Sequence, residues 1–268
     1  MANILVFDSG VGGLSIAAAL NESLPQHTLF FVSDNAAYPY GTKQETELVP
    51  RVIHVLEKML DILQVDIIVV ACNTASTVAL PVLRERLSVE VVGVVPAIKP
   101  AAKISQTRQL GVLATPATVK RQYTQELIDS FAADCQVALL GSSELVELSE
   151  QKLHQGNISS ERLTDIIKPW LSQECFIDTI VLACTHFPLL KKELNHVFMQ
   201  HNKNIQWVDS AASIAKRVSF LLAERADEQL SPREYNNRAI FTAEQEFSSG
   251  FMQHLNQLNI VDVVCTPL

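Results

Sequence analysis

Ile68-Val69-Val70-Ala71-Cys72-Asn73-Thr74 is the stretch that decides the fold, because the chain contains a second, similar copy of it. The second copy, with Cys184 lying 112 positions after Cys72, reads Ile180-Val181-Leu182-Ala183-Cys184-Thr185-His186. In each copy an apolar, mostly β-branched run, typical of a buried strand, leads into a cysteine and polar residues suited to the start of a helix. A repeat with so long a period predicts two related domains rather than a solenoid.

Short apolar runs alternate with amphipathic segments on both sides of the two copies. We predict strands at residues 3–8, 28–33, 66–72, 89–95, 109–114, 136–140, 178–184 and 205–209. We predict helices at residues 13–20, 45–63, 75–87, 118–132, 160–171 and 189–200. Strands that are apolar throughout, rather than at every second residue, are typical of parallel sheets covered on both faces. The fold class is therefore α/β, with mainly parallel sheets in two similar domains.

The boundary between the two domains is predicted from the proline-flanked segment at residues 95–100, which contains Pro96 and Pro100. We place a return crossing near Asp209. The first domain is then residues 1–96 plus 210–268 and contains Cys72, while the second is residues 97–209 and contains Cys184. The tail at residues 227–268 has the least readable pattern, and its role is not predicted.

Composition excludes several classes of protein. With 48% apolar and 19% charged residues the chain is typical of a globular protein, and its net charge of −8 argues against nucleic-acid or anionic-membrane binding. The start of the chain, Met1-Ala2-Asn3-Ile4, has no basic residue, so no secretory signal is expected, and no apolar run is long enough to span a bilayer. Five scattered cysteines without a Cys-x-x-Cys pair indicate free thiols in a reducing cytoplasm.

Cys72 and Cys184 are the strongest candidates for chemistry. Ligands of parallel sheets bind where strands end and helices begin, and a helix N-terminus favours the thiolate form of a cysteine. One cysteine in such a place is more often a small buried hydrophobe. Two cysteines in matched contexts, each followed by polar residues, favour a catalytic pair. Cys135, Cys175 and Cys265 lack such a context, so for them the structural interpretation holds.

Asp8 precedes a glycine-rich turn, Ser9-Gly10-Val11-Gly12-Gly13. The spacing is not the Gly-x-Gly-x-x-Gly of a dinucleotide site, and no phosphate-binding lysine follows, so no nucleotide cofactor is expected. Two interpretations stay open. Either the glycines let backbone N–H groups approach a substrate carboxylate while Asp8 faces an ammonium or a thiol, or Asp8 and Ser9 only cap the next helix.

Three other features also have a functional and a plain structural interpretation. His186, two residues after Cys184, would assist the thiol or hold a substrate group, since imidazole titrates near neutrality; otherwise it is a surface histidine. The loop at residues 33–42 is rich in turn formers and is either a substrate loop or a connection. Thr115 and Thr118 follow a predicted strand and either offer hydroxyls to a ligand or cap a helix.

Taken in order, the motifs resemble those of the glutamate racemases of the aspartate/glutamate racemase superfamily. The resemblance runs from the first strand to Asp209-Ser210 and so covers most of the chain. It rests on Val6-Phe7-Asp8-Ser9-Gly10-Val11-Gly12-Gly13-Leu14, Pro39-Tyr40-Gly41, Ala71-Cys72-Asn73-Thr74-Ala75, Val94-Val95-Pro96-Ala97-Ile98-Lys99-Pro100-Ala101, Gly111-Val112-Leu113-Ala114-Thr115 and Ala183-Cys184-Thr185-His186-Phe187-Pro188-Leu189.

The resemblance implies a cytoplasmic isomerase that converts L-glutamate to D-glutamate for peptidoglycan synthesis, cell wall biogenesis and cell shape, without pyridoxal phosphate or metal. It implies two α/β domains with the active site at their interface. By motif position, Cys72 takes the α-proton from D-glutamate and Cys184 from L-glutamate, assisted by Asp8 and His186. The substrate-binding candidates are Asp8, Ser9, Pro39, Tyr40, Gly41, Asn73, Thr74, Thr115, Thr118, Glu150, Thr185 and His186. We expect a homodimer that binds L- or D-glutamate and neither a membrane nor nucleic acid.

Two departures from the family pattern accompany the resemblance. Relatives often have Cys-Pro where this chain has Ser142-Ser143, although Glu150 still matches the family's glutamate in that segment. The N-terminus lacks the extension of relatives that are activated by a cell-wall precursor, so no such activation is expected. Two rival functions stay open: a two-cysteine racemase for aspartate or a hydantoin, and a non-catalytic amino-acid-binding protein. The second leaves the paired cysteines unexplained.

Overall fold

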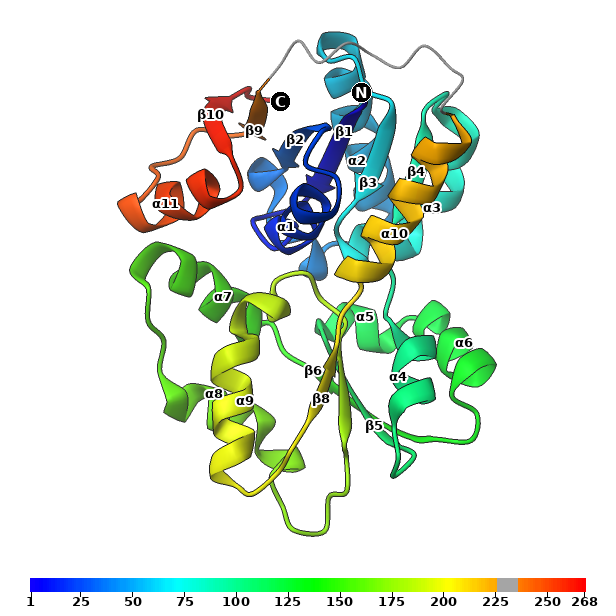
Figure 1. The fold of residues 1–268 in the computed structure, drawn as a ribbon, viewed down its shortest axis with the longest axis vertical. Coiled ribbons are helices and arrows are strands. Elements are labelled where there is room, and N and C mark those ends of the chain that lie inside the picture. Colours follow the sequence, from blue (N-terminus) through cyan, green and yellow to red (C-terminus); the bar gives the residue numbers. More distant parts are fainter. Residues whose placement is uncertain (226–235) are drawn as a thin grey trace. The chain divides into compact units, whose positions relative to one another are not determined.

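The computed structural model of the protein describes residues 1–225 and 236–268. These form two compact units, Met1–Val94 with Ala211–Leu268, and Val95–Ser210. Each unit is built on a parallel sheet with helices on both faces, which confirms the predicted α/β class (Figure 1). Residues 226–235, which the sequence assigned to the first domain, lie outside the described residues.

The sheet of the first unit has six strands in the order β10-β9-β2-β1-β3-β4. All its pairings are parallel. Its strands are β1 (Asn3–Asp8), β2 (Thr28–Ser33), β3 (Ile67–Val70), β4 (Glu90–Gly93), β9 (Asn237–Phe241) and β10 (Ile260–Cys265). Every residue of β1, β2 and β3 is buried, as expected for central strands that are apolar throughout.

Helices cover both faces of this sheet. On one face, α2 (Glu45–Ile62) and α3 (Asn73–Arg86) bury their apolar sides against Phe7, Phe30 and Val70. Elsewhere α1 (Leu14–Ser23) packs against α10 (Ala211–Glu224), and α11 (Ser249–Gln257) joins β9 to β10 (Figure 1). Each fully buried aliphatic or aromatic side chain contributes about 1.5–3 kcal/mol, so this core stabilises the packing of the helices on the sheet. The short 3-10 helices Asn35–Ala37 and Tyr40–Thr42 follow β2.

The sheet of the second unit repeats the central part of the first. Its strands β5 (Gln109–Ala114), β6 (Gln136–Gly141), β7 (Thr179–Leu182) and β8 (Gln206–Val208) have the order β6-β5-β7-β8, again with parallel pairings. The first sheet contains the same order, β2-β1-β3-β4, so β5 to β8 correspond in sequence to β1 to β4. The duplicated sequence motif therefore lies on equivalent strands, since β3 precedes Cys72 and β7 precedes Cys184.

Helices of the second unit lie on both faces of its sheet. On one face, α4 (Ile98–Ile104) and α6 (Gln122–Phe131) pack against β5 and β7. The helices α8 (Ser160–Ile167) and α9 (Lys191–Gln200) pack against each other. Gly111 in β5 makes room for the Trp170 ring, because a Cβ at Gly111 would lie 3.1 Å from that ring. Two further helices are α5 (Pro116–Lys120) and α7 (Glu144–Gln155).

Several predicted boundaries are wrong. The helix predicted at residues 118–132 is two helices, α5 and α6, because Arg121 between them is extended, with φ −75° and ψ 137°. The helix predicted at 160–171 ends at Ile167, since Pro169 has no N–H for an α-helical bond, and a 3-10 turn follows. The strand predicted at 89–95 is only Glu90–Gly93. Sequence patterns missed α4, α7, α10, β9, α11 and β10 altogether.

Two further observations concern the whole described chain. Within residues 1–225 and 236–268, no helix is both long and apolar enough to cross a membrane. All five cysteines are free thiols.

Candidate active site

Both candidate thiols lie at the carboxyl edge of a parallel sheet, where ligands of this architecture bind. Cys72 follows β3 and Cys184 follows β7, and their exposed fractions are only 6% and 7%. Just before each cysteine, an alanine ties its strand to the neighbouring central strand. The Ala71 N–H donates to Phe7 in the first unit, and the Ala183 N–H donates to Leu113 in the second. The two thiols therefore occupy equivalent places in equivalent sheets.

Cys72 is the N-cap residue of the 14-residue helix α3. The unpaired N–H groups of the first turn and the helix dipole favour a negative charge at this position. The Cys72 Sγ lies 3.8 Å from the Ser9 Oγ, and the Ser9 hydroxyl lies 3.4 Å from Asp8 Oδ1. With Ser9 donating to Asp8, the thiol is the donor to Ser9. A chain of polar contacts thus leads from the Cys72 thiol to the Asp8 carboxylate.

The Asp8 carboxylate also holds the glycine-rich turn. It accepts the N–H of Ser9 at 2.7 Å through one oxygen and the N–H of Gly13 through the other. A Cβ at position 13 would lie 2.8 Å from the Asp8 Cβ, so only glycine fits this close approach. Gly13, not Asp8, is the N-cap of α1. Asp8 therefore shapes the turn into α1 and, through Ser9, also reaches the thiol.

The segment after Cys184 differs from the segment after Cys72. Instead of an α-helix, a 3-10 helix follows at Phe187–Leu190, and α9 begins only at Lys191. The prediction that both cysteines open a helix is therefore met by Cys72 and wrong for Cys184.

His186 supplies Cys184 with a different kind of support. Its Nδ1 lies 3.9 Å from the Cys184 Sγ, and its Nε2 lies 2.7 Å from Glu150 Oε1. The ring is only 3% exposed, so the alternative of a surface histidine is wrong. Burial lowers the pKa of His186, but the hydrogen bonds and negative charges of Cys184 and Glu150 outweigh it and hold that pKa well above its usual value. A protonated imidazole beside the sulfur would stabilise a thiolate.

Glu150 lies on α7. Lys152, on the same helix, anchors the helix to a neighbouring segment. The Lys152 ammonium donates to the Leu189 carbonyl at 2.7 Å and binds the Glu193 carboxylate at 2.7 Å. These bonds join α7 to the segment that follows His186. The structure thus brings Glu150, His186 and Cys184 into one row, although residues 142–143 depart from the family pattern.

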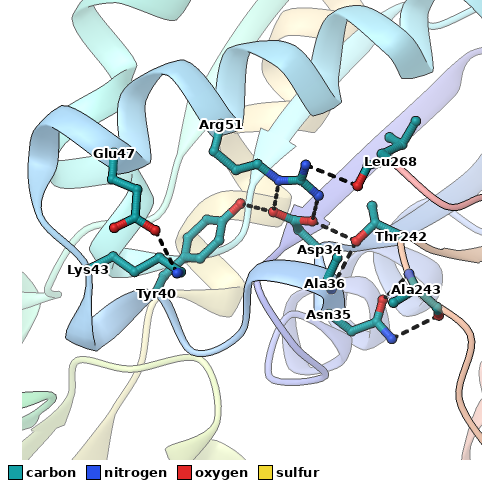
Figure 2. A network of polar contacts seen from close by, with 10 residues as sticks. All are labelled: Asp34, Asn35, Ala36, Tyr40, Lys43, Glu47, Arg51, Thr242, Ala243 and Leu268. Atoms are coloured by element: carbon teal, nitrogen blue, oxygen red, sulfur yellow. Dashed lines mark hydrogen bonds and ion pairs between the residues drawn. The ribbon is translucent and has the colours of Figure 1, made fainter.

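Tyr40 is almost fully buried, and its hydroxyl donates to Asp34 Oδ2 at 2.6 Å (Figure 2). Burial, together with the charge of Asp34 and the hydrogen bond to it, raises the pKa of Tyr40 far above its usual value, so the phenol stays protonated. The only proton of the Tyr40 hydroxyl is therefore used in the hydrogen bond to Asp34. Any contact of Tyr40 with a ligand would come from its backbone, next to that of Gly41. Pro39 is exposed and Gly41 half-buried.

The remaining candidates are small polar residues at the ends of strands. Asn73 and Thr74 begin α3 and are buried, and the Asn73 Oδ1 has no hydrogen-bond partner within the described part of the chain. Thr185, between Cys184 and His186, is also buried. Thr115 caps α5, since its Oγ1 accepts the Thr118 N–H at 3.2 Å. The Thr118 hydroxyl lies 3.0 Å from that of Thr115, so the capping interpretation holds for this pair.

The candidates therefore form two groups, one in each unit. The first consists of Asp8, Ser9, Pro39, Tyr40, Gly41, Cys72, Asn73 and Thr74, and the second of Thr115, Thr118, Glu150, Cys184, Thr185 and His186. Across the described residues, no three His, Cys, Asp or Glu side chains lie close enough to hold a metal ion. Sequence reasoning gave no role to Asp34, Arg51, Thr242 or Lys152. An acid directly after an apolar strand was the one available signal for Asp34.

Known proteins resemble the chain over most of its length. Residues 14–218 match the family described as Asp/Glu/Hydantoin racemase. A glutamate racemase of Shewanella sp. strain MR-4 is 47% identical over 255 residues, which cover 94% of this chain and 92% of the relative. A glutamate racemase of Salmonella typhimurium is 50% identical over 228 residues, covering 85% and 80%. The structure of Escherichia coli glutamate racemase in complex with L-glutamate and the activator UDP-MurNAc-Ala has a TM-score of 0.91 at 42% identity, covering 99% of this chain and 98% of that one.

Proposed function

The chain belongs to the Asp/Glu/hydantoin racemase family of isomerases, and from this premise we propose that it interconverts L- and D-glutamate without a cofactor, using Cys72 and Cys184 as an acid–base pair. One thiolate removes the α-proton, and the other cysteine, as the protonated thiol, delivers a proton to the opposite face. The α-carbon inverts, one thiol is consumed and one is formed, so the protons balance. The proposal requires one substrate to reach residues of both units.

In the L-to-D direction Cys184 is the base. A protonated His186, held by Glu150 at 2.7 Å, supports the Cys184 thiolate electrostatically. Cys72 is then the acid that protonates the opposite face. In the D-to-L direction Cys72 is the base. The first turn of α3 supports its negative charge, and the Ser9 hydroxyl, once released from Asp8, would donate to the thiolate.

The polar groups near the thiols suit an amino-acid substrate. The Asn73 Oδ1, buried and with no protein partner in the described structure, would accept an N–H of the substrate ammonium. Hydroxyls of Thr74 and Thr185, with the backbone N–H groups of Tyr40 and Gly41, would bind carboxylate oxygens. Of these donors, the hydroxyls next to the thiols in sequence, those of Thr74 and Thr185, would stabilise the charge that develops when the α-proton leaves, each by about 3–4 kcal/mol. For Thr115 and Thr118 we propose a position at the edge of this site, with their hydroxyls bonded mainly to each other.

The cellular role and the assembly are part of the same proposal. We place the enzyme in the cytoplasm, where free thiols persist, and its product D-glutamate in peptidoglycan synthesis, which supports the cell wall and cell shape. We propose a homodimer, which light scattering coupled to size-exclusion chromatography would test. Neither nucleic acid nor a membrane is expected as a partner.

One observation carries the proposal: the same buried thiol recurs at equivalent strand ends of two equivalent sheets. The test is circular dichroism of L-glutamate incubated with the purified protein, with L-aspartate and a hydantoin as competing substrates. We expect the signal of L-glutamate to decay to zero, in EDTA as well as without it, and that of L-aspartate to persist. Racemisation of aspartate or the hydantoin but not glutamate would favour the sister racemases. Because the Escherichia coli relative was crystallised with UDP-MurNAc-Ala, the assay is run with and without it.

A further inference from the structure

The Asp34 carboxylate is fully buried and accepts four hydrogen bonds from three directions (Figure 2). The Tyr40 hydroxyl and the Thr242 hydroxyl each donate at 2.6 Å. The guanidinium of Arg51 donates through Nε at 2.9 Å and through Nη2 at 2.5 Å. Both carboxylate oxygens are thus engaged, and the buried negative charge faces a positive one.

The partners of Asp34 come from separate parts of the first unit. Arg51 lies on α2, and its Nη1 also donates to the Leu268 carbonyl at 3.2 Å. Thr242 directly follows β9, and its Oγ1 also accepts the Ala36 N–H at 3.1 Å. Next to it, Asn35 exchanges two hydrogen bonds with the backbone of Ala243. The loop from Asp34 to Tyr40 is therefore fastened at its start by the segment after β9, and at its end through the Asp34 carboxylate.

Physical chemistry makes this cluster rigid. A buried carboxylate is tolerated only when its oxygens are paired, and a lost donor leaves a large desolvation cost. Burial raises the pKa of Asp34, but the hydrogen bonds from Arg51, Thr242 and Tyr40 together lower it below the usual value, so the group stays charged. Loss of any one donor would leave part of this buried charge without a hydrogen bond. Arg51, Thr242 and Tyr40 are thus linked through one carboxylate.

We propose that Arg51 and Thr242 are positioning residues that act through Asp34, setting the Tyr40 side chain and thereby the backbone of Tyr40 and Gly41 that receives the substrate. Neither residue touches the substrate in this scheme. The claim that these residues affect substrate binding rests on the proposed function, because it assumes that this loop binds glutamate. The claim that they position the loop does not depend on the proposed function.

The test compares two pairs of variants with a control from the same loop. Thr242→Val keeps the shape but removes the hydroxyl, whereas Thr242→Ser retains it. Arg51→Met removes the charge and Arg51→Lys keeps it. The control is Lys43→Met. Lys43 lies two residues after Gly41, and within the described residues its ammonium pairs with the exposed Glu47 alone, at 2.7 Å (Figure 2). KM and kcat for glutamate are measured for each variant, along with hydrogen exchange of residues 35–43 in the substrate-free protein.

We expect Thr242→Val and Arg51→Met to raise KM roughly tenfold with little change in kcat, since they weaken binding of substrate and transition state alike. Their loop amides should exchange faster, and Thr242→Ser should recover the wild-type values, as should Lys43→Met. Wild-type exchange in Thr242→Val would overturn the positioning of the loop, and faster exchange without a higher KM would overturn its link to the substrate. An equal rise in KM for Lys43→Met would contradict the specificity of the network.

If the wild-type protein does not racemise glutamate, the proposed function fails. The hydrogen-exchange data would still show whether Arg51 and Thr242 position the loop. If Arg51→Met does not fold, the Thr242 pair decides alone.

Discussion

The two cysteine motifs of this chain are near copies in sequence, but the groups around the two thiols differ. Cys72 caps a 14-residue α-helix and reaches Asp8 through a serine hydroxyl. Cys184 is followed by a 3-10 turn and lies beside an imidazole that is bound to a carboxylate. Both stand at the same place in sheets of the same strand order. A shared strand end therefore fixes where the sulfur lies, while the next few residues decide what stabilises its charge.

The difference has a consequence for how each half responds to change. Support for Cys72 comes largely from backbone N–H groups and a helix dipole, which substitution of side chains hardly alters. Support for Cys184 comes from a titratable side-chain pair, so it depends on two particular residues and on pH. We expect the second half to be the more sensitive one.

The largest effect is expected from the thiols themselves. Cys72→Ser and Cys184→Ser should each lower racemisation by 10²-fold to 10⁴-fold or more (an order-of-magnitude range), the usual contribution of a positioned acid or base, because a serine hydroxyl is too weak an acid to replace a thiol. Circular dichroism of glutamate measures the rate. Cys135→Ser is the matched control, since that thiol lies at the opposite edge of the second sheet, just before β6. Substantial turnover in either variant would remove that cysteine from the pair.

The second effect concerns the charged pair beside Cys184. Glu150→Gln should lower the pKa of His186, because the carboxylate holds it up through a hydrogen bond and its charge. It should lower kcat roughly tenfold for each unit by which that pKa falls below the assay pH. NMR titration of the His186 ring measures the pKa. The control is Glu144→Gln on the same helix, which loses only an exposed 2.7 Å ion pair to Arg162. An unchanged His186 pKa in Glu150→Gln would contradict the account of this half.

The Glu150–His186 pair should also make the free energy of unfolding depend on pH in a definite direction. Since the folded pKa of His186 is raised, its contribution is fully present below the unfolded value of about 6.5 and is lost as pH rises through the folded pKa. The difference in free energy of unfolding between the wild type and Glu150→Gln should therefore be largest near the lower end of the neutral range and shrink at alkaline pH. Urea denaturation at a series of pH values measures it, and a difference that grows with pH would oppose the assignment.

The smallest effect is expected from Ser9→Ala. The hydroxyl contacts both Asp8 and Cys72, but at 3.4 Å and 3.8 Å these contacts are long, and the N-terminus of α3 remains. We expect a few-fold loss of kcat, on the scale of one weak hydrogen bond, with the His186 titration unaltered. A loss as large as that of Cys72→Ser would mean that the serine, and not the helix, is the main support of the first thiol.

Local patterns in the sequence predicted the fold well. Apolar runs such as residues 68–71 predict buried parallel strands because burial on both faces leaves a continuous signature. The duplicated motif predicted two related domains, and the strand orders agree. The tail was unreadable because β9 is fixed by pairing with β2, more than 200 positions earlier in the chain, and β10 by pairing with β9, rather than by their own patterns.

Local sequence patterns predicted only part of the candidate site. Cys72, Cys184 and His186 lie within a few residues of a strand end, so the chain order places them. The Asp34 cluster was not predictable, since Arg51 and Thr242 lie 17 and 208 positions from Asp34 and only the fold brings them together. The bond between the Tyr40 hydroxyl and Asp34 was not predictable either, and substrate contact by the Tyr40 backbone stays a prediction.

The central claim, that each face of the α-carbon meets its own cysteine, is tested most directly by isotope exchange. L-glutamate is incubated with the enzyme in D₂O, and the first few per cent of conversion are analysed by mass spectrometry after separation of the enantiomers. The thiol that delivers the proton has already exchanged with solvent, so the account predicts D-glutamate with deuterium at Cα and recovered L-glutamate that retains its proton. D-glutamate that keeps a substantial share of the original proton, or early deuterium in the recovered L-glutamate, would contradict it and point to a single base.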